Sequence, residues 1–381
     1  MSDSPARVGI IGCGTISGTY LRNAPNFPSY DIVAVSDLRV DAAQARAEEF
    51  GIAKACTPDE LLADDDIDIV INIRPHSAHG AVGIAALEAG KSVYIEKPMA
   101  VSLDDAKRMM ELSAETGLRV GAAPDTFFGG TWQTARALID EGAIGEPIGG
   151  FSCIQSRSAG PWLEGDTEEE AKAREGYQSF YATNFFEFGV TWLFDRGPYY
   201  LHALVNLLGP VARVTGSARN TWTERNRGGS KFPCDTPTNF AGVLDFANGA
   251  VLSFINSADI VGMGLPHVEI YGSEGSLRCI DPNDFGGTLY LRKPGRGEEA
   301  EPIEPRFPNT SNMRGIGLAD MVTSMRADRP HRASGEMGLH TVEICHALHD
   351  ASAQNRHISL ETTCAQPAAL PAGLSDWEVD A

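Results

Sequence analysis

The chain has 381 residues, of which 43% are hydrophobic and 22% charged, and its formal net charge is −20 at pH 7. This length favours two domains over a single core, and the composition is typical of a globular protein. So large a negative charge argues against nucleic acid and anionic membrane surfaces as partners. Seven scattered cysteines without a C-x-x-C pair predict reduced thiols in a cytoplasmic protein, and we expect neither a secretory signal nor a membrane span.

The first third of the chain alternates short apolar runs with helical patterns. This alternation predicts an α/β domain with a doubly wound parallel sheet, covered by helices on both faces. A capping threonine, Thr57, followed by Pro58 and then Glu60, predicts a helix start, and Gly90 and Gly117 predict helix ends. The expected strands are residues 7–11, 30–36, 67–73, 92–95 and 119–122.

After Pro124 the pattern changes to successive strand-like runs separated by turns. Such a pattern predicts an α+β domain with an open, mostly antiparallel sheet. We therefore expect two domains, one over residues 1–123 and the other over residues 124–381. The expected helices are 131–141, 195–208 and 335–353, and the expected strands are 211–217, 240–246, 250–257, 267–271 and 277–280.

A glycine-rich turn follows the first expected strand. Gly12 and Gly14 can form a tight turn that lets the backbone approach a pyrophosphate, and Thr15 and Ile16 open the helix that comes next. An acidic residue, Asp37, stands at the end of the second expected strand. The three features together predict a dinucleotide-binding site.

Asp37 also bears on which dinucleotide is bound. Its carboxylate would accept hydrogen bonds from the ribose hydroxyls of the adenosine and repel a 2′-phosphate, so we expect NAD to be preferred. Arg39 lies nearby and keeps NADP open. The alternative for Asp37 is a purely structural cap of a turn or helix.

Lys97 stands between Glu96 and Pro98, directly after the expected strand 92–95. A proline steers the residue before it into an extended backbone, so we expect Lys97 to project from the strand end. Ligands of doubly wound sheets bind in the crevice outside the carboxyl ends of the strands. A titratable amine in that crevice is typical of a nicotinamide-dependent dehydrogenase, whereas the alternative is a solvated surface amine.

Asp195, Tyr199 and His202 recur at i, i+4 and i+7 in an expected helix, so they lie on one face. We expect hydride transfer to depend on Lys97 with Tyr199, while Asp195, also a catalytic candidate, and His202 hold the substrate. The Lys97 ammonium and the positive nicotinamide ring favour a phenolate at Tyr199. We expect the same charges to lower the pKa of Lys97, so either group can be the base. His202 is the base if the roles are reversed. The alternatives are a helix cap for Asp195 and packing for Tyr199 and His202.

Short motifs follow one another in a characteristic order along nearly the whole chain, at residues 12–17, 74–79, 86–91, 96–98, 124–127, 143–147, 195–202 and 271–275. In this order they resemble the glucose–fructose oxidoreductase, inositol dehydrogenase and rhizopine catabolism (Gfo/Idh/MocA) family, over about residues 6 to 360. The resemblance implies oxidation or reduction of a sugar, polyol or similar ring with NAD or NADP. It also implies that residues 1–123 form a Rossmann NAD(P)-binding domain. Residues 124–381 would then form a substrate-binding and oligomerisation domain, whose sheet joins copies of the chain into a dimer or tetramer.

The resemblance further implies roles for single residues. It identifies Lys97 as the active-site lysine and places Glu96, Pro75, His76 and His79 along the nicotinamide half of the cofactor cleft.

Two positions depart from the family pattern. Arg74 stands where threonine is usual, so we count it as a cofactor-binding candidate that brings a cation to cofactor or substrate. Tyr199 stands where many members have histidine.

We predict an NAD(P)-dependent dehydrogenase acting on CH–OH groups of a small carbohydrate, without a metal ion. Two alternatives stay open: an NAD-dependent glycoside hydrolase that acts by transient oxidation, and a ligand-sensing regulator without catalysis. Trp162 lies in an aromatic segment, 154–191, that can form a substrate wall, pack internally or contact another subunit. Glu343, His346 and His349 follow at i, i+3 and i+6, and we interpret them as one face of a structural helix.

Overall fold

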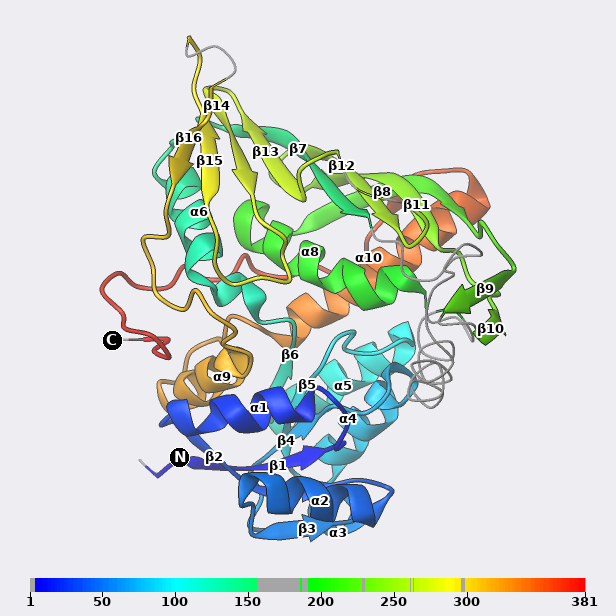
Figure 1. Cartoon of the computed structure of the whole chain (residues 1–381), viewed down its shortest axis with the longest axis vertical. Coiled ribbons are helices and arrows are strands. Elements are labelled where there is room, and N and C mark those ends of the chain that lie inside the picture. Colours follow the sequence, from blue (N-terminus) through cyan, green and yellow to red (C-terminus); the bar gives the residue numbers. More distant parts are fainter. Residues whose placement is uncertain are drawn as a thin grey trace.

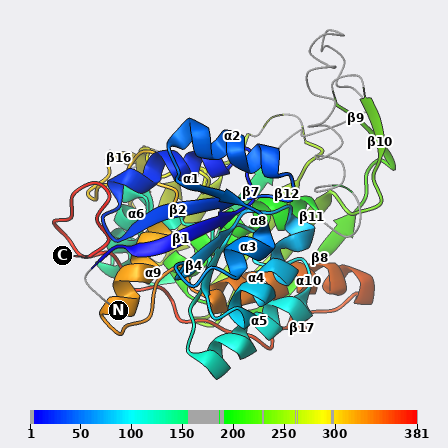
Figure 2. The same ribbon diagram turned by 90° about the horizontal axis from the view of Figure 1, so that it is seen from below.

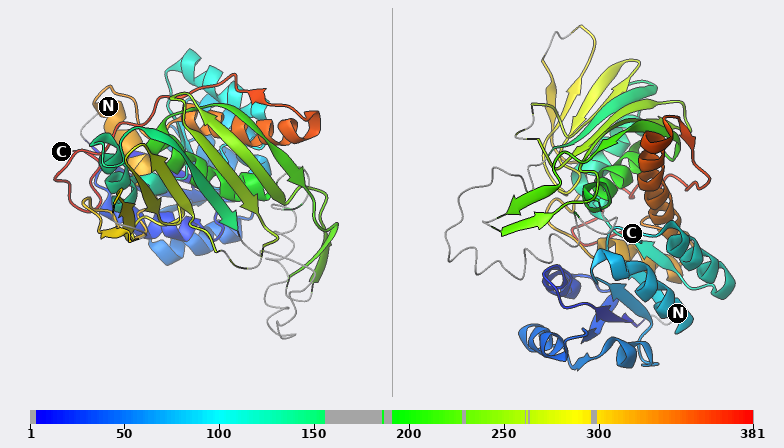
Figure 3. Two further views of the ribbon diagram at one scale, coloured as in Figure 1. Left: turned by 90° about the horizontal axis from the view of Figure 1, so that it is seen from above. Right: turned by 90° about the vertical axis from the view of Figure 1, so that its right-hand side faces the viewer.

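The structure is a computed structural model that describes residues 4–155, 186, 191–227, 230–260, 262, 264–295 and 299–380. A parallel sheet with its helices lies at one end and a second, larger sheet at the other (Figure 1). Helices α8 (Trp192–Leu208) and α10 (Gly335–Gln354) lie between the two. The side view in Figure 3 shows the same succession of layers.

The first sheet has six parallel strands in the order β3-β2-β1-β4-β5-β6, which confirms the predicted Rossmann fold. Figure 2 shows α1 and α2 on one side of this sheet and α4 and α5 on the other. The strands are β1 (Ala6–Ile11), β2 (Tyr30–Ser36), β3 (Lys54–Cys56), β4 (Ile69–Asn72), β5 (Ser92–Ile95) and β6 (Val120–Ala122). The helices are α1 (Ser17–Asn23), α2 (Val40–Phe50), α3 (Pro58–Leu62), α4 (His79–Glu88) and α5 (Leu103–Thr116), with 3-10 turns at Ala24–Asn26 and His76–Ala78.

Local sequence signals set the ends of these helices. The Thr57 hydroxyl accepts the backbone N–H of Glu60, and the Glu60 carboxylate accepts the N–H of Thr57, so the predicted capping box is confirmed. Gly117 ends α5 with a φ of 74°, a conformation that glycine adopts without steric cost. Strand β3 was not predicted, because three residues are too short for an alternating pattern.

Within the described residues, the second sheet has nine strands in the order β16-β15-β14-β13-β7-β12-β11-β8-β17. Its pairs are antiparallel except for β7 with β12, so the predicted open, mostly antiparallel sheet is confirmed. The strands are β7 (Pro147–Gln155), β8 (Val211–Arg219), β11 (Asn239–Phe246), β12 (Val251–Ser257), β13 (Val268–Gly272), β14 (Gly275–Cys279), β15 (Leu289–Arg292), β16 (Glu301–Ile303) and β17 (Ile358–Ser359), beside a hairpin of β9 (Glu224–Arg227) and β10 (Ser230–Pro233). The described part of the chain also contains the helices α6 (Gly130–Asp140) and α9 (Ile316–Arg326), with a 3-10 turn at Thr126–Phe128.

Helix α8 begins at Trp192, three residues before the expected start. Trp192, Leu193 and Phe194 are buried, and their packing extends the helix toward its N-terminus. Asp195 therefore lies inside the first turn, and the interpretation of Asp195 as the helix cap is wrong. The cap position is Thr191.

The chain after residue 315 returns to the first domain. Helix α9 packs against β6, and Trp377 of the C-terminal tail meets the ring of Phe27 edge-on at 5.1 Å between centroids. Leu370 and Val379 of the tail are buried in the same apolar cluster as Val8 of β1. The domain division at residue 123 stays a prediction, and the first domain's core also receives side chains from this returning segment.

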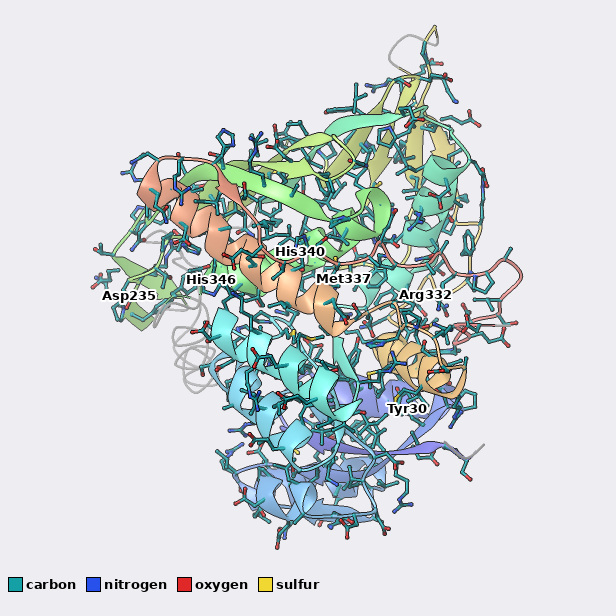
Figure 4. The ribbon with its side chains drawn as sticks, turned by 180° about the vertical axis from the view of Figure 1, so that it is seen from behind. Tyr30, Asp235, Arg332, Met337, His340 and His346 are labelled. Carbon is teal, nitrogen blue, oxygen red and sulfur yellow. The ribbon has the colours of Figure 1, made fainter. Side chains whose placement is uncertain are left out.

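Helix α10 joins the two halves of the molecule, and Figure 4 shows it crossing between the second sheet and α5. His346 lies 2.8 Å from the carbonyl oxygen of Val101, at the entrance to α5. Glu343 accepts the backbone N–H groups of Glu361 and Thr362 at 2.8 Å. Among the described helices, none combines the length and the apolar character that a bilayer crossing requires.

Candidate active site

A cavity of about 540 Å³ opens at the carboxyl ends of the parallel strands. It brings together every residue that the sequence predicts for cofactor binding, along with Asp195 and Tyr199 from α8. The lining residues are Gly12, Cys13, Gly14, Thr15, Ile16, Asp37, Arg39, Ile73, Arg74, Pro75, His76, His79, Glu96, Lys97, Asp195 and Tyr199.

A larger hollow of about 930 Å³ lies elsewhere, where the start of β6 meets α5 and the C-terminal tail. Arg119 lines this hollow, and two further arginines, Arg329 and Arg332, pair with the carboxylates of Asp320 and Asp380. Their charges are therefore balanced within the protein. We place the active site in the smaller cavity, because the glycine turn and Lys97 meet there.

The glycine turn fits a dinucleotide phosphate. Gly12 has a φ of 116°, and a Cβ there would lie 2.7 Å from the carbonyl oxygen of Ile73, so only glycine is accommodated. At Gly14 a Cβ would meet no protein atom within 4 Å. The space above Gly14 is thus open to the pyrophosphate of a bound cofactor.

Asp37 holds the turn from the side. Its Oδ2 accepts the backbone N–H of Cys13 at 2.9 Å, and its Oδ1 accepts the N–H of Arg39 at 3.0 Å. The guanidinium of Arg74 lies 3.5 Å from Oδ2. Asp37 therefore has a structural role in the turn and also faces the cavity.

His79 connects the two ends of the cavity. Its Nε2 lies 2.6 Å from the carbonyl oxygen of Arg74, and its Nδ1 lies 2.7 Å from that of Pro98. Asn72 donates to the carbonyl oxygen of His79 at 2.9 Å. The loop after β4 and the segment after Lys97 are thereby fixed to each other.

Lys97 forms an ion pair with Asp195, across the boundary between the two predicted domains. Its Nζ also donates to the backbone carbonyl of Asp195 at 3.0 Å and lies 5.4 Å from the ring centre of Tyr199. The side chains of Lys97 and Asp195 are 12% and 7% exposed. The sequence placed Asp195 and Lys97 in one site but did not predict that they pair.

This pair decides the charge of Lys97. Burial disfavours the ammonium, but electrostatic interactions with Asp195 above all, and also with Tyr199 and Glu96, outweigh burial and raise the pKa of Lys97. The expected lowering of this pKa is therefore wrong, because it ignored the carboxylate of Asp195. Burial raises the pKa of Asp195, yet Lys97, Arg196 and His76 together lower it below its usual value.

Glu96 is held in the wall of the cavity by another side chain of the first domain, that of Tyr20. The Tyr20 hydroxyl donates to Oε1 of Glu96 at 2.9 Å, and Oε2 accepts the backbone N–H of Lys97 at 3.1 Å. Glu96 thus fixes the backbone on which Lys97 stands.

Two residues that the sequence predicts for substrate binding, His202 and Trp162, are not among the described residues that line this cavity. His202 is buried, its Nδ1 lies 3.1 Å from the carbonyl oxygen of Pro124, and burial lowers its pKa to about 4. It does not line the cavity as far as the described residues show, and its substrate role stays a prediction. Trp162 lies outside the described residues.

Sequence reasoning missed a second hollow, of about 200 Å³, which shares Tyr199 with the cofactor cavity. Its walls are mostly polar. The Tyr200 hydroxyl lies 2.7 Å from Nδ1 of His267 and donates to Oδ1 of Asp281 at 3.3 Å. The lining residues are Ile154, Arg196, Tyr199, Tyr200, His267, Asp281 and Asn283.

Arg314 was also missed. Its guanidinium donates to the Asn283 side chain at 2.6 Å. Burial disfavours its charged form, but Tyr199, Glu96 and Asp125 more than compensate and raise its pKa. No local pattern marks Arg314 or Asn283, because they reach Tyr199 from loops far apart in the sequence.

Comparison with known proteins identifies the fold and the family. Residues 6–123 match the family described as "Oxidoreductase family, NAD-binding Rossmann fold", and residues 132–278 match the "GFO/IDH/MocA C-terminal domain". The chain is 24% identical over 359 residues to 1,5-anhydro-D-fructose reductase of Ensifer adhaerens, covering 93% of this chain and 99% of that protein. It is 35% identical over 144 residues to scyllo-inositol 2-dehydrogenase (NAD(+)) of Bacillus subtilis, covering 37% of this chain and 42% of that protein.

Solved structures agree on the fold. Levoglucosan dehydrogenase in complex with NADH and L-sorbose matches with a TM-score of 0.76 at 20% identity, covering 94% of this chain and 99% of that one. Aldose-aldose oxidoreductase from Caulobacter crescentus matches with a TM-score of 0.76 at 19% identity, covering 93% and 100%. The chain therefore belongs to the GFO/IDH/MocA oxidoreductase family and carries its NAD-binding Rossmann domain.

Proposed function

We propose that the protein is a dehydrogenase that transfers hydride between a nicotinamide cofactor and a CH–OH or C=O carbon of a sugar, polyol or related ring. The observation that carries the proposal is the meeting of Lys97, Asp195 and Tyr199 at one end of the cofactor cavity. Relatives named as an anhydrofructose reductase and an inositol dehydrogenase support a carbohydrate substrate.

The bound nicotinamide supplies the hydride acceptor or donor. Oxidation of an alcohol also requires a proton to leave the hydroxyl, and reduction requires one to be delivered. Lys97, held as an ammonium by Asp195, would donate a hydrogen bond to the reacting oxygen and stabilise negative charge there. Tyr199 would exchange the proton, with the ammonium of Lys97 lying 5.4 Å from the centre of its ring.

The polar hollow beyond Tyr199 would hold the rest of the substrate. Its walls carry a cation, Arg196, and a carboxylate, Asp281, together with the side-chain amide of Asn283. Donors and acceptors of both charges suit the hydroxyl groups of a neutral ring, each of which both donates and accepts. This supports a polyhydroxylated substrate over a strongly anionic one.

A substrate panel tests the proposal. Purified protein is incubated with NAD or NADP and, in turn, myo-inositol, scyllo-inositol, levoglucosan and a set of aldoses, and reduced nicotinamide is followed by its absorbance. The proposal expects steady accumulation of the reduced cofactor with at least one compound. Release of a sugar from a glycoside without such accumulation identifies a redox-neutral hydrolase, and binding without any conversion identifies a sensor.

We propose in addition that the second sheet joins copies of the chain into a dimer or tetramer. The outer face of this sheet is uncovered in Figure 3. Val251 and Tyr271, which both pair with Gly149 of β7, are 51% and 40% exposed. Light scattering after size exclusion tests this assembly, because Val251→Glu should shift it toward the monomer.

A cytoplasmic location completes the proposal. All seven cysteines are free thiols and buried, which is typical of a reducing compartment. Cell fractionation with an antibody against the chain tests the location.

A further inference from the structure

We propose that Arg74 sets the cofactor preference of this chain: it offsets the charge of Asp37 and binds a 2′-phosphate, so that NADP is accepted alongside NAD. The proposal rests on the cofactor cavity alone. It does not depend on which substrate is used, or on whether hydride transfer occurs.

The first observation is that Asp37 is already engaged by the protein. Two backbone N–H groups and the Arg74 guanidinium surround its carboxylate, at 2.9, 3.0 and 3.5 Å. The side chain is only 15% exposed. An aspartate that repels a 2′-phosphate does so by its uncompensated charge, and here a cation stands beside that charge.

The second observation is the balance of charge in the part of the cavity around Asp37. Among the residues that the structure describes, the charged ones that line the cavity beside the glycine turn are Asp37, Arg39 and Arg74, so one negative and two positive charges leave a balance of one positive charge. A ribose with two hydroxyls does not need this positive charge. A 2′-phosphate, which carries up to two negative charges, is attracted by it.

The third observation is that Arg74 cannot leave the cavity easily. Its carbonyl oxygen lies 2.6 Å from Nε2 of His79, and its backbone N–H donates to Oδ1 of Asn72 at 3.3 Å. Pro75 follows, which further restricts the backbone of Arg74. The backbone of Arg74 is therefore held in place, and its side chain, which is 16% exposed, extends to Asp37, where we expect the adenosine ribose to bind.

Arg74 would have two competing partners when NADP is bound: the carboxylate of Asp37 and the 2′-phosphate. Its contact with Asp37 is a single approach at 3.5 Å, which is long for a charge-assisted hydrogen bond. Guanidinium binds phosphate with two parallel N–H donors, a shorter and stronger arrangement. A 2′-phosphate would thus draw Arg74 from Asp37, while Asp37 keeps the N–H groups of Cys13 and Arg39.

Binding calorimetry without any substrate tests the inference. The titrants are NAD+, NADP+, AMP and adenosine 2′,5′-bisphosphate, and the proteins are wild type, Arg74→Thr and Arg74→Lys. We expect Arg74→Thr to raise the ratio of the NADP+ to the NAD+ dissociation constant by about tenfold or more, the effect of one charge-assisted contact. The bisphosphate should lose affinity in parallel, AMP should not, and Arg74→Lys should fall between the two.

Arg7→Thr is the matched control. Arg7, at the start of β1, pairs with Asp66, which precedes β4, so this arginine–aspartate pair lies at the amino ends of the parallel strands. Its loss should leave the ratio unchanged. Thermal unfolding of Arg74→Thr close to that of wild type shows that the variant is folded. A ratio that stays within about threefold of wild type overturns the inference, as does an equal loss of both cofactors, which makes Arg74 a contact of the shared adenosine.

Discussion

The ammonium of Lys97, at the end of β5, is bound to the carboxylate of Asp195, in the first turn of α8. Lys97 also reaches the backbone carbonyl of Asp195 at 3.0 Å, so one side chain of the cofactor-binding half holds the α8 helix by two contacts. The ion pair is therefore both a joint between the two halves of the molecule and the source of a fixed positive charge beside Tyr199.

The proposed role of this charge predicts the effect of removing it. Lys97→Ala should lower turnover by about a hundredfold or more, because the reacting oxygen loses its charged donor, while affinity for NAD+ is largely kept. Steady-state kinetics and calorimetry on the same preparation separate the two effects. Lys107→Ala, at an exposed lysine that pairs with Glu361, is the control and should retain full turnover. Normal turnover in Lys97→Ala would contradict the account.

Removal of the partner should change the pH dependence. In Asp195→Asn the carboxylate that raises the pKa of Lys97 is gone while burial remains, so this pKa should fall. The alkaline limb of the kcat/KM profile should therefore move to lower pH. Asp140→Asn, which breaks a helix-surface pair with Arg136, is the control and should leave the profile in place. An unmoved limb in Asp195→Asn would show that the ion pair does not govern activity.

The same pair predicts how stability varies with pH. The pKa of Lys97 is raised on folding, so its contribution is present below its unfolded pKa and is lost as pH rises through the folded value. The pKa of Asp195 is lowered, so its contribution is present above its unfolded pKa and is lost as pH falls through the folded value. The stability difference between wild type and Asp195→Asn should be largest between about pH 4 and pH 10 and shrink outside that range. Urea unfolding across this range measures it, and a constant difference would contradict the assignment.

His202, unlike the pair of Lys97 and Asp195, should lower the stability of the protein as the pH falls from about 7 to about 5. Burial lowers its pKa to about 4, so the unfolded chain takes up a proton first as pH falls below about 6.5. Between pH 7 and pH 5 this histidine should cost about 2 kcal/mol of unfolding free energy. Wild type should therefore lose about that much more stability than His202→Gln on the same acidification. Equal losses would mean that His202 is not held neutral by burial.

The glycine turn predicts two different outcomes for similar substitutions. Gly14→Ala places its Cβ in open space, so the free energy of unfolding should be unchanged, while NAD+ affinity falls by roughly tenfold as the methyl group meets the pyrophosphate. Gly12→Ala puts a Cβ 2.7 Å from a carbonyl oxygen at a φ of 116°, so it should destabilise the fold by about 1–3 kcal/mol. Calorimetry and urea unfolding distinguish the two. Unchanged NAD+ affinity in Gly14→Ala would show that the cofactor does not bind against this turn.

Local signals explain what could be predicted from the sequence. β2 and β5 were predicted to the residue, because both are short apolar runs bounded by turn signals, and Asp37 and Lys97 follow such strands directly. Residues at the carboxyl ends of parallel strands meet at one edge of the sheet, so a single cavity was expected there and is found.

Long-range pairing explains what could not be predicted. The bond between Lys97 and Asp195 joins residues 98 positions apart, and it reverses the expected direction of the lysine pKa shift. Arg314 and Asn283 approach Tyr199 from loops whose positions depend on the order of the second sheet. Helix α9 was missed, and it packs against the first domain across nearly 200 residues of chain, a relationship that no local periodicity records.

Isotope transfer tests the central claim most directly. A substrate found in the panel is prepared with deuterium on the carbinol carbon and incubated with NAD+ and the wild-type protein, and the nicotinamide product is analysed by mass spectrometry. The account predicts one deuterium in each reduced cofactor, in equal amount to the ketone formed, and almost none in the same time with Lys97→Ala. A ketone formed without deuterium in the nicotinamide would contradict hydride transfer at this site.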